Sequence, residues 1–401
     1  MLVVLLELTI KQIPSAKYPG RNKEFFFDAI SEYEVISSPF NQTDTAEFTI
    51  PKDIYARDSN NKLYSLVDTN KPLNGSASVA PLFLKGDEIT FNRGYLYQEK
   101  RGAEYVDVIR MTGRNGLPDL FTGYISEVSS DKPFVLKCED AMWKLKQIPV
   151  KKNTWKGYSV QKIFTEILKG TEFTVSKKSD ITIDYDMGHF ETGDETAAQV
   201  LARVRKDLKF CAYFRGKELR IGYPIYYEDE ARTLDFGFQE NIISSDLVYA
   251  RKDDVILSAV VTTKEPKVAT KQSKDGGDKT RIEDKEILVY TNKDGVFEYT
   301  AKKPFAENVQ GERRTLTYTN VTEKEMFKLA VADLQKYHYT GFSGDFTTFA
   351  LPHVKPGDNA RITSPVLPDQ NGTYKVKQVR YYGSESAGAR QEITVDYKLN
   401  I

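Results

Sequence analysis

The sequence predicts a mainly β protein with a small α/β unit between two strand-rich ends, and three observations support this. Short segments of alternating apolar and polar residues, separated by Gly, Pro and Asp, fill residues 1–150 and 236–401. Residues 151–235 instead contain two segments with helical periodicity. Aromatic residues make up 12% of the chain and favour pleated, half-buried surfaces. Because 401 residues exceed one ordinary core, we expect several domains.

Residues 1–150 are expected to form an antiparallel barrel or sandwich that opens with a strand. The apolar run Met1–Leu6 continues through Leu8 and Ile10. Since Glu7 interrupts the run and it lacks a basic leading segment, we interpret it as a strand and not as a signal peptide. Alternation predicts further strands at Glu32–Val35, Thr45–Ile50, Glu88–Phe91 (ended by Gly94), Tyr105–Met111, Phe121–Ile125 and Pro133–Cys138, the last two pairing.

Residues 151–235 are expected to form a small α/β unit of two helices and a hairpin. Ser159 is placed to cap the first helix, and Gly170 fits its C-terminal stop. A T-x-x-E capping box at Thr192 and Glu195 predicts the start of the second helix. Its apolar face would hold Ala197, Val200, Leu201, Val204 and Leu208, and strands at Phe210–Phe214 and Glu218–Ile221 would follow, joined at Arg215-Gly216-Lys217.

Residues 236–401 return to strands, with two exceptions. The segment Lys264–Lys285 is polar and rich in Lys, Asp and Gly, so we expect a long loop. A second capping box at Thr322 and Glu325 predicts one helix, with Met326, Leu329, Ala330 and Leu334 on its buried face. Strands are then expected at Asp345–Ala350, Asn359–Thr363, Thr373–Tyr381 and Glu392–Leu399. The two strand-rich ends are similar in size and character, which suggests a structural duplication without visible sequence identity.

Charge and cysteine content narrow the class of protein. Lys and Arg number 57, and so do Asp and Glu, so the net charge is zero; a dedicated nucleic-acid binder needs a clustered basic excess. No segment is apolar and long enough to predict a membrane span. The two cysteines, Cys138 and Cys211, both lie in apolar strand segments and are expected to be buried thiols, as in a protein made in a reducing cytoplasm.

One group of residues resembles a metal site in composition. Asp184, Asp186, His189 and Glu191 are close in sequence and have suitable ligand types. However, the aspartates alternate with apolar residues, as in a strand with one wet face, and none of the three histidines has a second histidine at metal-binding spacing. We therefore predict neither a metal site nor a cofactor.

The sequence also lacks recognisable catalytic motifs. It has no G-x-S-x-G nucleophile elbow and no phosphate-binding G-x-x-x-x-G-K-[ST] loop, and Gly113–Gly116 is interpreted as a turn. Paired carboxylates of the glycosidase kind depend on spatial separation, so the sequence leaves them open. Trp143 and Trp155 could be ligand platforms but are interpreted as core or interface residues. No catalytic residue is predicted.

Three segments together resemble a known family. They are Phe121–Ile125 followed by Cys138–Leu145, then Phe190–Gly222, and then His353–Asp358 with Gly372–Val379. Their order resembles the baseplate hub proteins of contractile phage tails, including the late control D protein group and the hub part of type VI secretion spikes. Ser37-Ser38, Thr43–Ala46 and Ile50-Pro51 also look like the first hairpin of the hub's tube barrel.

This resemblance implies two tube-type antiparallel β-barrels, at 1–150 and at 236–401 with one helix, and a small α/β domain at 151–235. It implies a non-enzymatic baseplate hub of a phage or prophage tail, made in the host cytoplasm. Three copies would form a ring of six barrels between the tail-tube protein and a central spike protein. DNA would pass through the channel without specific binding, and a puncturing device would be a separate chain.

Two alternatives from other functional classes stay open. The abundance of Asp and Glu on a β-rich scaffold is compatible with a polysaccharide or cell-wall hydrolase that uses paired carboxylates. The Tyr and Trp content is compatible with a carbohydrate-binding module.

Overall fold

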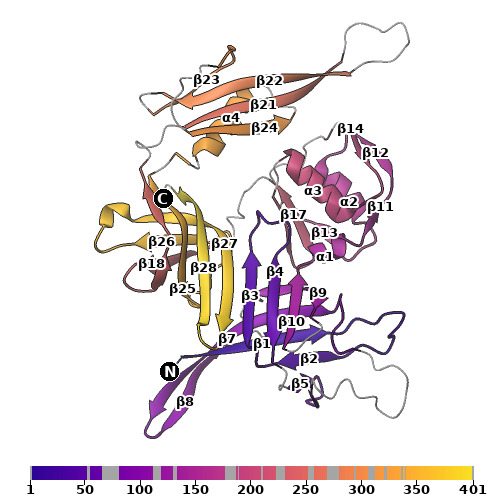
Figure 1. The fold of residues 1–401 in the computed structure, drawn as a ribbon, viewed down its shortest axis with the longest axis vertical. Helices are drawn as coiled ribbons and strands as arrows, with labels where there is room; N and C mark the ends of the chain where they lie inside the picture. Colours follow the sequence, from indigo (N-terminus) through magenta and orange to yellow (C-terminus); the bar gives the residue numbers. More distant parts are fainter. Residues whose placement is uncertain are drawn as a thin grey trace.

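A computed structural model of the chain describes residues 2–51, 55–65, 81–111, 119–129, 133–176, 187, 189–208, 211–222, 231–251, 257–268, 280–292, 295–305, 312–319, 323–335, 337–338 and 340–399. Figure 1 shows an elongated molecule with the N-terminal strands at one end and an inserted sheet at the other. Within the described residues, 17 strands from both ends of the chain form one connected hydrogen-bonded network. The prediction of a mainly β protein is confirmed; the tube-type barrels stay a prediction.

The first half of this network, which we name module 1, is antiparallel throughout. Its strand order is β2-β1-β7-β9-β10-β4-β3, with β5 and β6 added beside β2, and β8 added beside the far end of β7. The strands are β1 (Leu2–Lys11), β2 (Glu24–Phe27), β3 (Glu32–Ser37), β4 (Thr45–Ile50), β5 (Tyr55–Asp58), β6 (Leu63–Ser65), β7 (Glu88–Arg101), β8 (Glu104–Met111), β9 (Phe121–Val128) and β10 (Phe134–Glu139).

Alternation predicted the strands of module 1 well because each has one buried face. In β4, for example, Ala46, Phe48 and Ile50 are buried and the residues between them are more exposed. The expectation that Gly94 ends its strand is wrong. Strand β7 continues through Gly94 to Arg101 because it is paired with β1 on one side and with β8 on the other.

The second half of the network is module 2, and its order is β18-β26-β27-β28-β25, with β19 and β20 both paired to β25. Its elements are β18 (Thr233–Gly237), β19 (Ile242–Ser245), β20 (Val248–Ala250), β25 (Gly341–Phe349), β26 (Asn359–Thr363), η6 (Pro368–Gln370), β27 (Gly372–Ser384) and β28 (Gly388–Leu399). One apolar core, which includes Phe48, Phe91, Phe236 and Phe346, runs through both modules.

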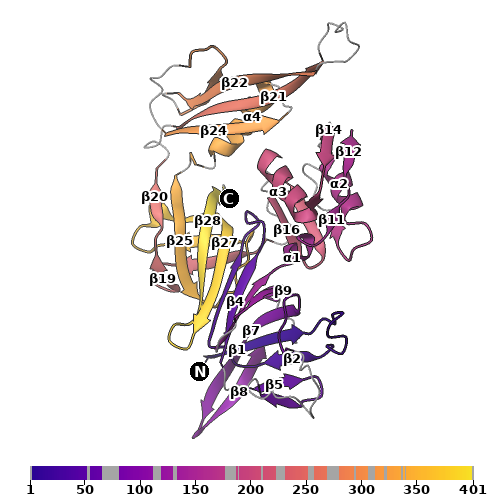
Figure 2. The same cartoon turned by 45° about the vertical axis from the view of Figure 1, so that its right-hand side comes forward.

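The small α/β domain has its own core between three helices and short strands (Figure 2). Its elements are α1 (Met142–Leu145), β11 (Pro149–Val150), β12 (Asn153–Lys156), α2 (Val160–Ile167), β13 (Thr174–Val175), β14 (His189–Thr192), β15 (Glu195–Thr196), α3 (Ala197–Leu208), β16 (Cys211–Arg215) and β17 (Glu218–Gly222). The predicted cap is confirmed, since the Ser159 side chain accepts from the Lys162 amide. Gly170 (φ +83°) and Gly216 (φ +59°) adopt the left-handed conformation of a helix stop and a tight turn.

The capping box expected at Thr192 and Glu195 is wrong by one helical turn. Helix α3 begins at Ala197, and its cap is the reciprocal pair Thr196 and Gln199. The Thr196 amide donates to Gln199 Oε1 (2.8 Å), and the Gln199 amide donates to Thr196 Oγ1 (3.4 Å). Both pairs of residues satisfy the sequence pattern, and Thr192 lies instead in strand β14.

A separate four-stranded sheet is inserted between β20 and β25. It consists of β21 (Leu257–Val268), β22 (Thr280–Thr291), β23 (Phe297–Thr300) and β24 (Glu312–Thr319), with α4 (Glu323–Gln335) packed against it. The region 236–401 therefore contains this insertion and all of module 2 except the first residues of β18, which begins at Thr233. Thr322, of the second expected capping box, lies outside the described residues.

The loop expected at Lys264–Lys285 is largely wrong. Its two ends belong to β21 and β22 and are paired from Lys264↔Asp284 to Val268↔Thr280, while residues 269–279 lie outside the described part. Figure 1 shows this strand pair extending beyond the sheet core. Such a strand pair lacks the apolar alternation that identifies a half-buried strand, so its composition suggested a loop.

Candidate functional site

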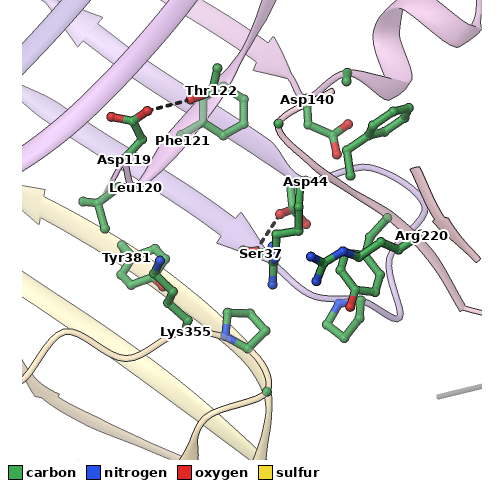
Figure 3. Close-up of a pocket in the computed structure, with 18 of the residues that line it drawn as sticks. Ser37, Asp44, Asp119, Leu120, Phe121, Thr122, Asp140, Arg220, Lys355 and Tyr381 are labelled. Atoms are coloured by element: carbon green, nitrogen blue, oxygen red, sulfur yellow. Dashed lines mark hydrogen bonds between the residues drawn. The ribbon is translucent and has the colours of Figure 1, made fainter. Parts of the chain in front are cut away.

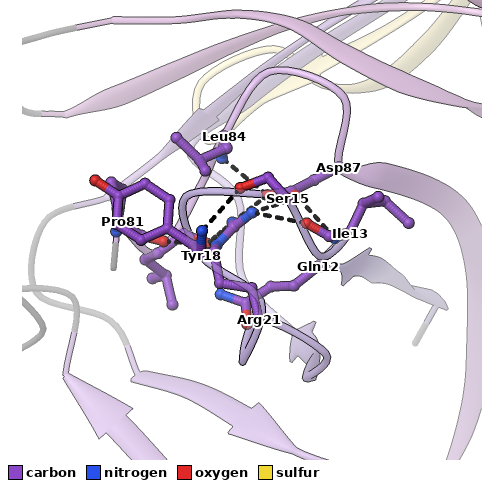
Figure 4. Close-up of polar contacts among 9 residues, drawn as sticks. Gln12, Ile13, Ser15, Tyr18, Arg21, Pro81, Leu84 and Asp87 are labelled. Carbon is purple, nitrogen blue, oxygen red and sulfur yellow. Dashed lines mark hydrogen bonds and ion pairs between the residues drawn. The ribbon is translucent and has the colours of Figure 1, made fainter. Parts of the chain in front are cut away.

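Module 1 contains a sharp turn built around a buried carboxylate (Figure 4). Gly86 supplies a positive φ of +96°, and Asp87 follows with 1% of its side chain exposed. Its carboxylate accepts from Arg21 at 2.6 and 2.9 Å. It also accepts from the amides of Leu84 (2.8 Å) and Ile13 (3.0 Å). Four donors thus compensate the desolvation of this charge.

Module 2 contains the same turn. Gly357 has a φ of +93°, and Asp358 is buried. Its carboxylate accepts from Arg232 Nη2 (2.6 Å), from the Lys355 amide (2.9 Å) and from the Arg232 amide (3.2 Å). The Arg232 side chain is 49% exposed, whereas that of Arg21 is 3% exposed.

Both turns are bound to the neighbouring strand in the same way. The amide of each turn glycine donates to the backbone carbonyl of one residue in that strand. The amide of the same strand residue donates to the backbone carbonyl of the turn aspartate. This residue is Ile125 in module 1 (2.8 and 2.9 Å) and Val376 in module 2 (2.9 and 2.9 Å). Ile125 and Val376 are therefore equivalent positions.

The equivalence extends through the strand registers. In module 1 the pairs are Phe91↔Phe121, Ile125↔Cys138, Val128↔Leu136 and Leu136↔Phe48; in module 2 they are Ile362↔Gly372, Val376↔Val395, Val379↔Ile393 and Ile393↔Phe346. A register shift follows Ile125 and Val376 in both modules. Strands β3, β4, β7, β9 and β10 thus correspond to β19–β20, β25, β26, β27 and β28. The chain contains one module twice.

The two modules are joined along a strand seam. The first half of β27 pairs with β26, and its second half pairs with β3, from Val379↔Ser37 to Ser384↔Glu32. Within the seam, Gly383 lies opposite Tyr33, and a Cβ at Gly383 would lie 2.6 Å from the Tyr33 ring. Only glycine allows this close approach of ring and backbone.

Side chains bind across the seam on both faces. On the inner face, the buried Arg93 donates from Nη2 to the carbonyl of Ala350 (2.9 Å), which also accepts from Tyr95 Oη (3.0 Å). On the outer face, Arg380 forms an ion pair with Glu34. The seam thus combines a buried cation held by a module 2 carbonyl with a half-exposed ion pair.

A cavity of about 340 Å³ lies where both modules and the α/β domain meet (Figure 3). Asp44 and Asp140 line it from module 1, and Arg220 lines it from the α/β domain. Burial raises the pKa of Asp44, and burial together with the nearby charge of Asp44 raises the pKa of Asp140 well above its usual value.

This aspartate pair has a structural explanation. The Asp44 carboxylate accepts from Ser37 Oγ (2.6 Å) and from the Ser38 amide (3.0 Å). Asp140 accepts from the Met142 amide (3.0 Å) at the start of α1, and its own amide donates to the Asp44 carbonyl (3.0 Å). The pair therefore joins the ends of β4 and β10 and anchors the α/β domain.

The structure describes only part of the group of residues that resembles a metal site in composition. Asp184 and Asp186 lie outside the described residues, as does Gly113–Gly116. His189 and Glu191 are exposed on β14, with 4.0 Å between Nε2 and Oε1. Among the residues that the structure describes, no three His, Cys, Asp or Glu side chains are grouped as metal ligands.

Both tryptophans are buried, as interpreted. Trp143 stacks on Tyr124 with 5.5 Å between the ring centres, and Trp155 Nε1 donates to Thr192 Oγ1 (3.3 Å). Cys138 and Cys211 are both buried and are not joined by a disulfide, which confirms the expectation for them. In the described part of the chain, no helix has the length and apolarity needed to span a membrane.

Sequence reasoning missed the duplicated turn. A signal was present, because a Gly-Asp dipeptide directly precedes a strand at Gly86-Asp87 and again at Gly357-Asp358. The arginine partners come from different places: Arg21 lies between β1 and β2, and Arg232 directly precedes β18. No spacing rule would have paired them with the aspartates.

Comparisons with known proteins bear on the fold. No protein-family model matches the sequence, and a search of curated proteins finds no match. Among solved structures, a tail protein from Neisseria meningitidis MC58 is similar, with a TM-score of 0.56, 13% identity and coverage of 98% of this chain and 97% of that chain. The 43 kDa tail protein of prophage MuSo2 from Shewanella oneidensis has a TM-score of 0.54, 10% identity and 98% coverage of both chains. This chain shares their fold along nearly its whole length.

Proposed function

We propose that this chain is a structural component of a phage or prophage tail and forms the baseplate hub of a contractile tail. Two observations support the proposal. The fold is shared end to end with two tail proteins, and the chain contains one β-module twice. The duplication carries the proposal, because it gives a single polypeptide two equivalent building blocks.

In this proposal the chain is a homotrimer. Three copies of two modules make a ring of six similar modules, which matches a threefold partner on one side and a sixfold partner on the other. The partners would be a central spike protein and a tail-tube protein, as the resemblance to the late control D and type VI spike hub proteins implies. DNA would pass through the ring without specific binding. The balanced net charge of the chain fits this role, because tight binding to phosphates needs an excess of Lys and Arg.

The proposed role is non-enzymatic. The aspartate pair Asp44 and Asp140, which lines the cavity between the domains, is engaged by local backbone and hydroxyl donors. A hydrolase with paired carboxylates and a carbohydrate-binding module remain the competing proposals, and no described feature favours either. Release of reducing sugar from peptidoglycan by the purified chain would support the hydrolase.

Native mass spectrometry and negative-stain electron microscopy test the main proposal. We expect a trimer with a central opening, formed by the chain alone or after addition of spike and tail-tube proteins from the same tail. A chain that stays monomeric at all concentrations and in the presence of these partners would contradict the hub role. A glycan array on which the purified chain binds no glycan would separately argue against the binding-module alternative.

A further inference from the structure

We infer that neighbouring copies are joined by a second strand seam, in which the β19–β20 edge of one copy pairs with the end of β9 of the next. This inference rests on the proposed ring and specifies which strands pair between its neighbouring copies. The partner is a second copy of this chain, because both halves of the joint are present on one polypeptide as equivalents of the seam between its own modules.

The seam inside the chain is the template. Strand β3 of module 1 adds to the free side of β27 beyond the Gly-Asp turn of module 2, with Val379↔Ser37 and Arg380↔Ile36 as its first pairs. In this seam Tyr33 is 4% exposed and belongs to the common core. The β3 edge is therefore closed within the monomer.

The equivalents of these residues follow from the registers. Tyr33 and Ser245 are equivalent because they pair with the equivalent residues Phe48 and Phe346. The same register continues into β20, where Val248 pairs with Ser343. Val248 is therefore the counterpart of Ile36, and Tyr249 that of Ser37. On the other strand, the counterparts of Val379 and Arg380 are Val128 and Ser129.

The β19–β20 edge is open in the monomer. Among the pairings of the described residues, β19 and β20 bind only β25, so their other side presents backbone donors and acceptors. Two large apolar side chains are exposed there, Val248 at 66% and Ile243 at 44%. Ser245 is also exposed, whereas its counterpart Tyr33 is buried by the seam. These features fit an edge that a strand completes.

The receiving strand has the matching vacancy. Strand β9 pairs with β7 only from Phe121 to Tyr124, and beyond Ile125 the described pairings of β9 are with β10 alone. In module 2 the corresponding stretch of β27 is the one that β3 covers. The template register therefore places Val128 opposite Tyr249 and Ser129 opposite Val248 of the neighbouring copy.

A cysteine pair tests this register in the full-length chain. We expect Ser129→Cys with Val248→Cys to form a disulfide between copies under mild oxidation, with covalent dimers and trimers on non-reducing gels, because directly opposed strand residues lie within disulfide reach. The matched positive control is Ile36→Cys with Arg380→Cys. This pair should form a disulfide within one chain, so the protein should still run as a monomer on the non-reducing gel. Glu127→Cys with Val248→Cys is out of register and should cross-link at least tenfold less.

An edge charge gives an independent test. Val248→Asp should weaken self-association at least tenfold and leave the thermal midpoint of the monomer unchanged, because the side chain is exposed. Val366→Asp is the matched control, since Val366 is also 66% exposed but lies between β26 and β27. A ring that forms as readily with Val248→Asp as with the wild-type chain, or that forms without the Ser129–Val248 cross-link, would overturn the seam and leave the hub proposal standing. A chain that never forms a ring contradicts both.

Discussion

The two Gly-Asp turns show what the duplicated module keeps and what it varies. Both turns keep the left-handed glycine, the buried aspartate and the paired hydrogen bonds to Ile125 or Val376. They differ in the arginine, because Arg21 is enclosed and Arg232 is half-exposed. They also differ in the flanking strand, which is antiparallel in β1 and parallel in β18. The backbone geometry fixes the carboxylate, and the source of its counter-charge is free to vary.

The strongest test of this comparison removes the carboxylate charge in each turn. We expect Asp87→Asn to cost about 3–5 kcal/mol of unfolding free energy, because it leaves Arg21 buried and unpaired. Asp358→Asn should cost only about 1–3 kcal/mol, since water can solvate Arg232. Urea unfolding followed by tryptophan fluorescence measures both. Equal losses would show that the exposure of the arginine is irrelevant.

A second substitution tests whether the seam makes the two modules one cooperative unit. Gly383→Ala introduces a Cβ 2.6 Å from the Tyr33 ring, so we expect a loss of about 1–3 kcal/mol. Calorimetry should then show a transition that broadens or separates, because the junction weakens first. Gly193→Ala is the control, since its Cβ would meet no atom within 4 Å. Equal midpoints for the two variants would argue against a tight seam.

A pH series separates the modules, because only module 2 has a histidine beside its turn. Burial and the nearby Arg93 lower the pKa of His353 to about 3, and the equivalent position in module 1 is Leu82. The unfolded chain takes up a proton below its ordinary pKa of about 6.5, and the folded chain does not. The contribution of the neutral His353 side chain to the free energy of unfolding is therefore complete above pH 6.5 and is lost as the pH falls toward 3.

His353→Leu should remove that dependence. We expect the wild-type chain to lose about 1.4 kcal/mol more than the variant between pH 7.5 and pH 5.5, as measured by urea unfolding at each pH. His189→Leu is the control, because His189 is exposed. The raised pKa values of Asp44 and Asp140 act in the opposite direction, and both variants retain them. Parallel curves for wild type and His353→Leu would contradict the expectation.

The smallest effect is expected on the outer face of the seam. Arg380 and Glu34 are both partly exposed, so Arg380→Gln should cost about 0.2–1 kcal/mol, and less in high salt. A double-mutant cycle with Glu34→Gln isolates the pair. A coupling above 2 kcal/mol would mean that this face contributes as much as the buried side.

The sequence predicted the elements of the fold better than their partners. Alternation located strands such as Thr45–Ile50 because burial on one face leaves a period of two. It could not show that β27 changes partner from β26 to β3, since apolar residues flank a polar one both at Tyr374–Val376 and at Val379–Tyr381. For the same reason the seam contacts of Arg93 and Gly383 were invisible. Side-chain pattern records burial, whereas register depends on residues far away in the chain.

The passage of β27 through both modules has a mechanical consequence. A force that pulls the modules apart along this strand loads the rungs of the β3–β27 ladder together, in shear, because the two strands are paired without interruption from Val379↔Ser37 to Ser384↔Glu32. Hydrogen bonds that share a load must break almost simultaneously, whereas bonds at a peeled edge break one by one. The joint between the modules therefore resists a pull along β27 more strongly than a pull that peels β3 away from it.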